Sequence, residues 1–132
     1  MIRILLADDH PVLRHVLVPL IAEAGDMAVV AECESGDELL HEGLRVRPDV
    51  VLVDPELPGM DPLQASCELH EQLPRVRVLV HARCFSLVTF SRAQRLGAVG
   101  YLLKSDGLDD LPRRIRAVVG GATAWTPGAP AR

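Results

Sequence analysis

Three aspartates and one lysine each come directly after a short apolar run of the sequence. Asp8 and Asp9 follow residues 4–7, Asp54 follows residues 50–53, and Lys104 follows residues 101–103. A single aspartate in such a place is more often a helix cap or a turn residue. The joint placement of three carboxylates and an ammonium group after three such runs instead indicates one shared site.

The residue types in this group suit phosphoryl transfer. Crowded carboxylates repel one another unless a positive charge lies among them. Mg²⁺ prefers oxygen ligands and commonly bridges to a phosphate, so Asp8, Asp9 and Asp54 are candidate ligands for it. With the metal ion and Lys104 cancelling charge on the phosphoryl oxygens, Asp54 is the candidate nucleophile, and the product is an aspartyl phosphate.

The apolar runs predict the elements that bring these side chains together. Five runs have strand length, at residues 4–7, 28–31, 50–53, 76–80 and 101–103. They are continuous rather than alternating, which is typical of parallel strands covered on both faces. We therefore expect an α/β fold, a single doubly wound five-stranded parallel sheet with five helices in the flavodoxin-like strand order 2-1-3-4-5. Ligands of such sheets bind at the carboxyl ends of the strands.

Helical spacing fills the segments between the runs. We expect the first helix to begin at Pro11 and to be kinked or shortened at Pro19. Ser35 and Glu38 form a capping box for the second helix, and Asp61 suits the cap of the third. The fourth helix is expected over residues 87–96 and the fifth from Leu108. The side chains expected in the core from the first two helices are Leu13, Val16, Leu17, Leu20, Ala24, Leu39, Leu40 and Leu44.

Composition limits the class of protein. Acidic residues outnumber basic ones by 18 to 14, and the basic residues are spread out, so this chain by itself is not expected to bind nucleic acid. Its three cysteines never form a C-x-x-C pair, which favours a reducing compartment. The beginning of the chain does not resemble a signal peptide and no run is long enough to span a bilayer, so we expect a cytoplasmic protein without membrane contact.

Residues 1–121 are expected to form one domain. Residues 122–132 are rich in Ala, Pro and Gly and are expected to form a flexible tail or the start of a linker.

Three blocks of the sequence resemble the receiver domain of bacterial two-component response regulators. They are Ala7-Asp8-Asp9-His10-Pro11, the run from Pro48 to Asp54 followed by Leu57-Pro58-Gly59-Met60-Asp61, and Gly97 to Lys104. The His10-Pro11 pair and the Gly-Tyr-Leu-Leu-Lys run resemble the LuxR-type (NarL-like) subfamily, whose members carry a helix-turn-helix after the receiver. The resemblance covers almost the whole chain.

The resemblance implies a role for each site residue. Asp54 accepts a phosphoryl group from a sensor histidine kinase, and Asp9 with Asp8, Asp54 and the backbone carbonyl of Glu56 holds Mg²⁺. Lys104 pairs with the phosphoryl oxygens. Tyr101 is the aromatic switch residue, although a half-buried strand aromatic is the alternative interpretation. The family further implies a homodimer that regulates transcription and reaches DNA only through an output domain absent from this chain.

The sequence departs from the family at the end of the fourth expected strand. Receivers usually carry Ser or Thr there, and the residue in this chain is Ala82. An alanine cannot donate the hydrogen bond to the phosphoryl group, which is worth about 1.5–3 kcal/mol. Arg83 is more simply a solvated loop residue than a substitute, and His81 and Cys84 are interpreted as packing or loop residues. Ser105 replaces the proline that many receivers have after the lysine.

Three functions therefore remain open. The first is a phosphorylated switch, which is not an enzyme beyond self-catalysed phosphotransfer and dephosphorylation. The second is a pseudo-receiver that acts without phosphate, for which Ala82 is the support. The third is a phosphohydrolase with an aspartyl nucleophile, which the sequence disfavours because the residues after Asp54 lack the Asp-x-Asp-x-Thr pattern.

Overall fold

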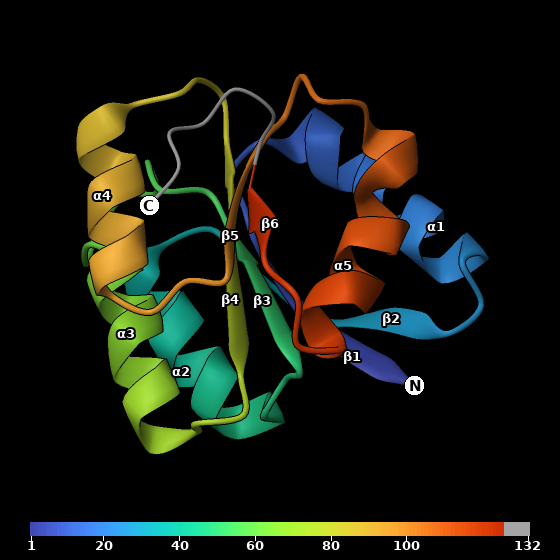
Figure 1. The fold of residues 1–132 in the computed structure, drawn as a ribbon. Coiled ribbons are helices and arrows are strands. Elements are labelled where there is room, and N and C mark those ends of the chain that lie inside the picture. Colours follow the sequence, from blue (N-terminus) through green and yellow to red (C-terminus); the bar gives the residue numbers. More distant parts are fainter. Residues whose placement is uncertain (126–132) are drawn as a thin grey trace.

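The structure is a computed structural model that describes residues 1–125. A single parallel sheet crosses the molecule and carries helices on both faces (Figure 1). Its strands are β1 (Ile2–Ala7), β2 (Met27–Cys33), β3 (Val50–Val53), β4 (Arg77–Ala82), β5 (Gly100–Leu103) and β6 (Ala124–Trp125). The helices are α1 (Pro11–Glu23), α2 (Gly36–Val46), α3 (Pro62–Gln72), α4 (Leu87–Arg95) and α5 (Leu111–Val119), and a short 3-10 helix, η1 (Leu108–Asp110), precedes α5.

The strand order is β2-β1-β3-β4-β5-β6. The expected α/β sheet and the order of its first five strands are confirmed, but the expected count of five strands is wrong. The order reverses beside β1, because β2 lies on one side of it and β3 on the other. In an open parallel sheet this reversal opens a crevice at the carboxyl ends of the strands. The aspartates that follow β1 and β3 lie at this crevice.

Strand β6 is formed by two residues of the segment that we expected to be a tail. Ala124 and Trp125 pair with Gly100 and Tyr101 of β5. The close approach requires glycine at position 100, because a Cβ there would overlap the carbonyl oxygen of Ala124. The Trp125 ring packs edge-on against Phe90, with the ring centroids 5.3 Å apart. The rest of the expected tail, residues 126–132, lies outside the described residues.

Two apolar layers cover the sheet, one on each face. Residues of one strand alternate between the layers: in β3, Val51 lies in the layer under α2, α3 and α4, and Leu52 lies in the layer under α1 and α5. Figure 1 shows the same division, with α1 and α5 on one side of the sheet and α2, α3 and α4 on the other. Because both faces are buried, every residue of β3 is buried, which explains the continuous apolar run.

The face that helix α1 packs on the core agrees with the sequence prediction at Leu13, Leu17, Leu20 and Ala24 and differs at Val16. Leu17 and Ile21, one turn apart, are fully buried, whereas Val16 is 47% exposed. Successive residues of a helix point about 100° apart, so Val16 lies beside the buried stripe rather than on it. Of the kink or shortening expected at Pro19, the shortening is wrong, because the helix continues through Pro19 to Glu23.

The predicted helix starts are mostly confirmed. Ser35 Oγ accepts a hydrogen bond from the Glu38 N–H at 3.2 Å, and Asp61 Oδ1 accepts one from the Leu63 N–H at 2.9 Å. Two details differ. Leu44, expected in the core, lies at the exposed edge of α2. The fifth helix was expected from Leu108, but its first residues form η1 before the α-helix begins.

Candidate functional site

Asp8 and Asp9 leave the carboxyl end of β1 in different environments. Asp8 is 1% exposed, and its Oδ1 accepts a hydrogen bond from the His10 N–H at 2.8 Å. Its own N–H donates to the Cys33 carbonyl at 2.9 Å, which continues the pairing of β1 with β2 by one residue. The next residue, Asp9, is exposed. The chain therefore presents one fixed, buried carboxylate beside one that reaches solvent.

Asp54 holds the equivalent position at the end of β3. It is 2% exposed, and its N–H donates to the Ala7 carbonyl at 2.9 Å. Its Oδ1 accepts a hydrogen bond from the Glu56 N–H at 2.8 Å, the two-residue turn that aspartate side chains commonly form with the following backbone. Backbone hydrogen bonds thus fix both the main chain of Asp54 and one oxygen of its carboxylate.

Lys104 joins the two buried aspartates. Its Nζ lies 2.8 Å from Asp8 Oδ2 and 2.6 Å from Asp54 Oδ2. Its backbone N–H donates to the Ala82 carbonyl at 2.7 Å, so the register of β5 against β4 sets where the side chain starts. Burial alone lowers the pKa of the ammonium group, but the hydrogen bonds to Asp54 and Asp8 outweigh burial and raise its pKa above the ordinary value. Lys104 is therefore a largely buried cation at the carboxyl ends of the strands, stabilised by two carboxylates.

The three aspartates fit a shared divalent cation. Asp8, Asp9 and Asp54 each offer one carboxylate oxygen, and these oxygens lie within 4.8 Å of one another. Mg²⁺ binds oxygen ligands at about 2.0–2.1 Å, so ligands on opposite sides of the ion are about 4.2 Å apart. The cluster therefore has the chemistry and the size of a magnesium site. Glu56 lies two residues beyond Asp54, and its backbone reaches the cluster through the hydrogen bond from its N–H to Asp54 Oδ1.

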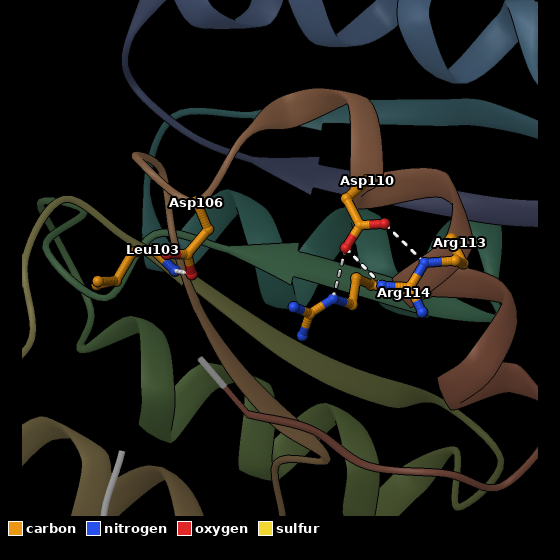
Figure 2. A network of polar contacts seen from close by, with 5 residues as sticks. All are labelled: Leu103, Asp106, Asp110, Arg113 and Arg114. Carbon is orange, nitrogen blue, oxygen red and sulfur yellow. Dashed lines mark hydrogen bonds and ion pairs between the residues drawn. The ribbon is translucent and has the colours of Figure 1, made fainter. Parts of the chain in front are cut away.

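The loop after Lys104 is held by its own side chains (Figure 2). Asp106 Oδ2 accepts a hydrogen bond from the Leu103 N–H at 3.0 Å and closes the turn around Lys104. Farther along, Asp110 accepts hydrogen bonds from Arg113 at 2.6 Å and Arg114 at 2.9 Å. Residues 1–125 contain no cis peptide bond, so the bond before Ser105 is trans. The base of Lys104 is thus fixed by a turn as well as by the sheet.

Ala82 and Tyr101 lie on the neighbouring strands β4 and β5, and only Tyr101 carries a hydroxyl group. Ala82 is buried and offers only a methyl group. Tyr101 is fully buried, and its hydroxyl donates to the Cys84 carbonyl at 2.8 Å and accepts from the Ser86 N–H at 3.3 Å. Burial raises the pKa of this hydroxyl. The Tyr101 ring also packs on Phe90, at 5.8 Å between centroids. Tyr101 is therefore anchored to the loop that follows β4.

His81 was interpreted as a packing or loop residue, and it is a buried residue of β4. It is 3% exposed. Burial, together with the nearby charge of Lys104, lowers its pKa to about 4. Among the described residues its Nδ1 has no hydrogen-bond partner, and it lines a small cavity beside Asp106 and Arg114 with room for about one water molecule. Sequence did not reveal this environment, because a continuous apolar run does not show which face a histidine takes.

The family model for the response regulator receiver domain matches residues 4–116. The chain belongs to the response regulator receiver family. This receiver domain is 33% identical over 127 residues to the response regulator GacA of Pseudomonas viridiflava, covering 96% of this chain and 59% of GacA. It is 34% identical over 118 residues to the nitrate/nitrite response regulator protein NarL of Escherichia coli K12, covering 89% of this chain and 55% of NarL.

The fold of the receiver domain also matches solved structures of response regulators. A crystal structure of a LuxR-family two-component response regulator from Aurantimonas sp. SI85-9A1 superposes with a TM-score of 0.88 at 31% identity, covering 95% of this chain and 89% of that one. The resemblance to LuxR-type and NarL-like receivers seen in the sequence is thus confirmed. The receiver domain spans less than two thirds of the length of GacA and of NarL.

These matches confirm the signalling identity of the domain. It is the receiver domain of a two-component response regulator, and its relatives include transcriptional regulators. Receiver domains act as signalling switches rather than as enzymes and typically bind Mg²⁺ at an acidic pocket. In residues 1–125 no helix is both long enough and apolar enough to cross a membrane.

Proposed function

We propose that Asp54 is the phosphoacceptor of this receiver domain and that a sensor histidine kinase supplies the phosphoryl group in a Mg²⁺-dependent reaction. The observation that carries the proposal is the position of the Lys104 ammonium group, which bonds to Asp8 at 2.8 Å and to Asp54 at 2.6 Å. A lysine held between two buried carboxylates at the end of a parallel sheet is the arrangement that phosphoryl transfer to a carboxylate needs.

The chemistry follows from the partners of each Asp54 oxygen. Oδ1 is held by the Glu56 N–H, and Oδ2 is held by Lys104. One of these oxygens attacks phosphorus, a P–O bond forms, and the P–N bond to the kinase histidine breaks, with its electron pair returning to the imidazole. The Lys104 ammonium group then exchanges its hydrogen bond with the Asp54 carboxylate for one with a phosphoryl oxygen. Asp8, Asp9, Asp54 and the Glu56 carbonyl would hold Mg²⁺, which would supply positive charge for the phosphoryl oxygens.

Ala82 supports a second candidate, a pseudo-receiver that acts without phosphate. A phosphoryl group on Asp54 has no hydroxyl at position 82 to bond, and the Tyr101 hydroxyl is already bonded inside the domain. Beryllium fluoride with Mg²⁺ mimics the phosphoryl group and distinguishes the two candidates. A change in oligomeric state, measured by sedimentation velocity, supports the phosphorylated switch, and an unchanged state supports the pseudo-receiver.

The partners of the domain complete the proposal. The domain forms a homodimer in the cytoplasm, does not contact membranes, and regulates transcription through an output domain joined after β6. Two observations support the output domain. GacA and NarL extend well beyond the part that matches this chain, and one structural relative is described as a DNA-binding response regulator. Apart from self-catalysed phosphotransfer and dephosphorylation, the domain turns over no substrate.

Intact mass measured after incubation with a small-molecule phosphodonor and Mg²⁺ tests the phosphoacceptor. We expect a phosphate adduct on the wild-type protein and none on Asp54→Ala. Asp109→Ala is the matched control, because it removes an exposed aspartate of η1 and should keep the adduct. An adduct that survives Asp54→Ala would show that the nucleophile is assigned wrongly.

A further inference from the structure

The loop between β3 and α3 rests on the beginning of α2. The Gly36 N–H donates to the Pro58 carbonyl at 3.1 Å. In return, the Met60 N–H donates to Asp37 Oδ2 at 3.0 Å. The two contacts are reciprocal, one from the helix backbone and one to a helix side chain, so they hold residues 58–60 against the first turn of α2.

The fit between the loop and the helix leaves no spare room. A Cβ at Gly36 would overlap the carbonyl oxygen of Met60, and a Cβ at Gly59 would overlap Asp37 Oδ2. Gly59 also has a φ of 78°, a conformation that side chains other than glycine rarely adopt. The Asp37 carboxylate therefore packs directly on the turn of the loop.

The opposite end of this loop begins at the phosphoacceptor. The Glu56 N–H bonds to Asp54 Oδ1 at 2.8 Å, so the backbone of Glu56 lies between a fixed aspartate and the contact with Asp37. A loop tied at both ends samples fewer conformations, and ordering its backbone for a ligand costs less free energy. The contact with Asp37 therefore restrains one end of a loop whose other end is bonded to Asp54.

We propose that Asp37 is a positioning residue for the metal site, acting by holding the loop from Asp54 to Met60 so that the Glu56 carbonyl faces the bound cation. The inference rests on the proposed function, because it assumes that Mg²⁺ binds beside Asp54. It assigns a role to a residue of α2 that lies outside the aspartate cluster.

A simpler role for Asp37 predicts different behaviour. Acidic residues in the first turn stabilise a helix through its dipole, and α2 has Asp37 and Glu38 there. Asp37→Asn removes the charge but keeps an oxygen that accepts the Met60 hydrogen bond, whereas Asp37→Ala removes both. Glu38→Ala is the matched control, because it removes the same charge from the same turn.

Mg²⁺ titrations followed by the backbone amide NMR signals of the full chain measure the effect, with thermal unfolding recorded for each variant. The loss of one hydrogen bond predicts that Asp37→Ala binds Mg²⁺ about three- to tenfold more weakly than the wild type. We expect Asp37→Asn and Glu38→Ala to stay within about twofold of the wild type, and hydrogen exchange at Met60 to be faster in Asp37→Ala alone.

The outcomes separate the inference from the proposed function. If the wild type binds Mg²⁺ and Asp37→Ala binds it equally well, the positioning role is overturned and the proposed function stands. Equal weakening by Asp37→Ala, Asp37→Asn and Glu38→Ala would also overturn it, since charge would then explain the effect. If Mg²⁺ causes no shift at the three aspartates of the wild type, the proposed function itself is contradicted.

Discussion

Lys104 and Asp54 form a buried ion pair in which Nζ and Oδ2 are 2.6 Å apart and the side chains are 9% and 3% exposed. Asp8 shares the same ammonium group. The pair connects the ends of two strands that are not neighbours, because Asp54 follows β3, Lys104 follows β5, and β4 lies between these strands. This lysine neutralises two buried carboxylates and, in the proposed function, also takes part in phosphoryl transfer, so substitutions of Lys104 should affect both stability and phosphorylation.

Replacing Lys104 with methionine should destabilise the domain by about 3–5 kcal/mol, because the two buried carboxylates lose their counter-ion. The free energy of unfolding in urea measures this loss. Mg²⁺ should restore more stability to Lys104→Met than to the wild type, since the cation replaces the missing positive charge. A loss below about 1 kcal/mol would mean that the pair is solvated and carries little energy.

Restoring a hydroxyl with Ala82→Thr should strengthen the response to phosphorylation. A hydrogen bond to a charged phosphoryl group is worth about 1.5–3 kcal/mol, which corresponds to about a ten- to hundredfold shift in the switching equilibrium. The matched control is Ala82→Val, which has nearly the same shape without the hydroxyl. Sedimentation velocity with beryllium fluoride and Mg²⁺ should show more association for threonine than for valine. Equal responses would show that another group compensates.

The buried His81 should make stability depend on pH. Burial and the Lys104 charge lower its pKa to about 4, below the value of about 6.5 in an unfolded chain. The unfolded state then binds more protons between these values, so stability is complete above about pH 6.5 and falls as the pH drops towards 4. The loss is at most about 3 kcal/mol, from 1.36 kcal/mol per pKa unit.

Urea unfolding at several pH values, compared between the wild type and His81→Leu, isolates this contribution. The leucine variant should lack the part of the pH dependence between about 4 and 6.5 that comes from the imidazole, while the carboxylates contribute equally to both proteins. Parallel curves for the two proteins would show that His81 titrates normally in the folded state.

The pairing of β6 with β5 can be tested through Trp125, the single tryptophan of the chain. Gly100→Ala places a methyl group against the Ala124 carbonyl and should displace β6, moving Trp125 away from Phe90 into water. We expect red-shifted tryptophan fluorescence in this variant. Gly120→Ala is the control, because a Cβ there meets its nearest atom at 3.4 Å. An unshifted spectrum in Gly100→Ala would argue against the pairing.

The position of the site follows from the sequence because the sheet is parallel. Asp8, Asp54 and Lys104 each come directly after an apolar run, and the carboxyl ends of parallel strands share one edge. Strand β6 was not predictable in this way. Two residues are too few for a periodic pattern, and the pairing depends on the absence of a side chain at Gly100 and on the contact between Trp125 and Phe90.

The direction in which each side chain points could not be predicted from the sequence either. A continuous apolar run predicts a strand buried on both faces without showing which face each residue takes, so the environment of His81 was not visible. In α1, Val16 and Leu17 are equally apolar, and only the direction of the helix over the sheet selects Leu17 for burial. The Asp37 contact joins residues 23 positions apart, which no local pattern reveals.

Site mapping tests most directly whether an acylphosphate forms at Asp54. Protein treated with a phosphodonor is reduced with borohydride, which converts an aspartyl phosphate to homoserine, and its peptides are sequenced by mass spectrometry. We predict homoserine at position 54 when Mg²⁺ is present and none when EDTA replaces it. Homoserine at another aspartate, or an equal yield with EDTA, would contradict the proposed site.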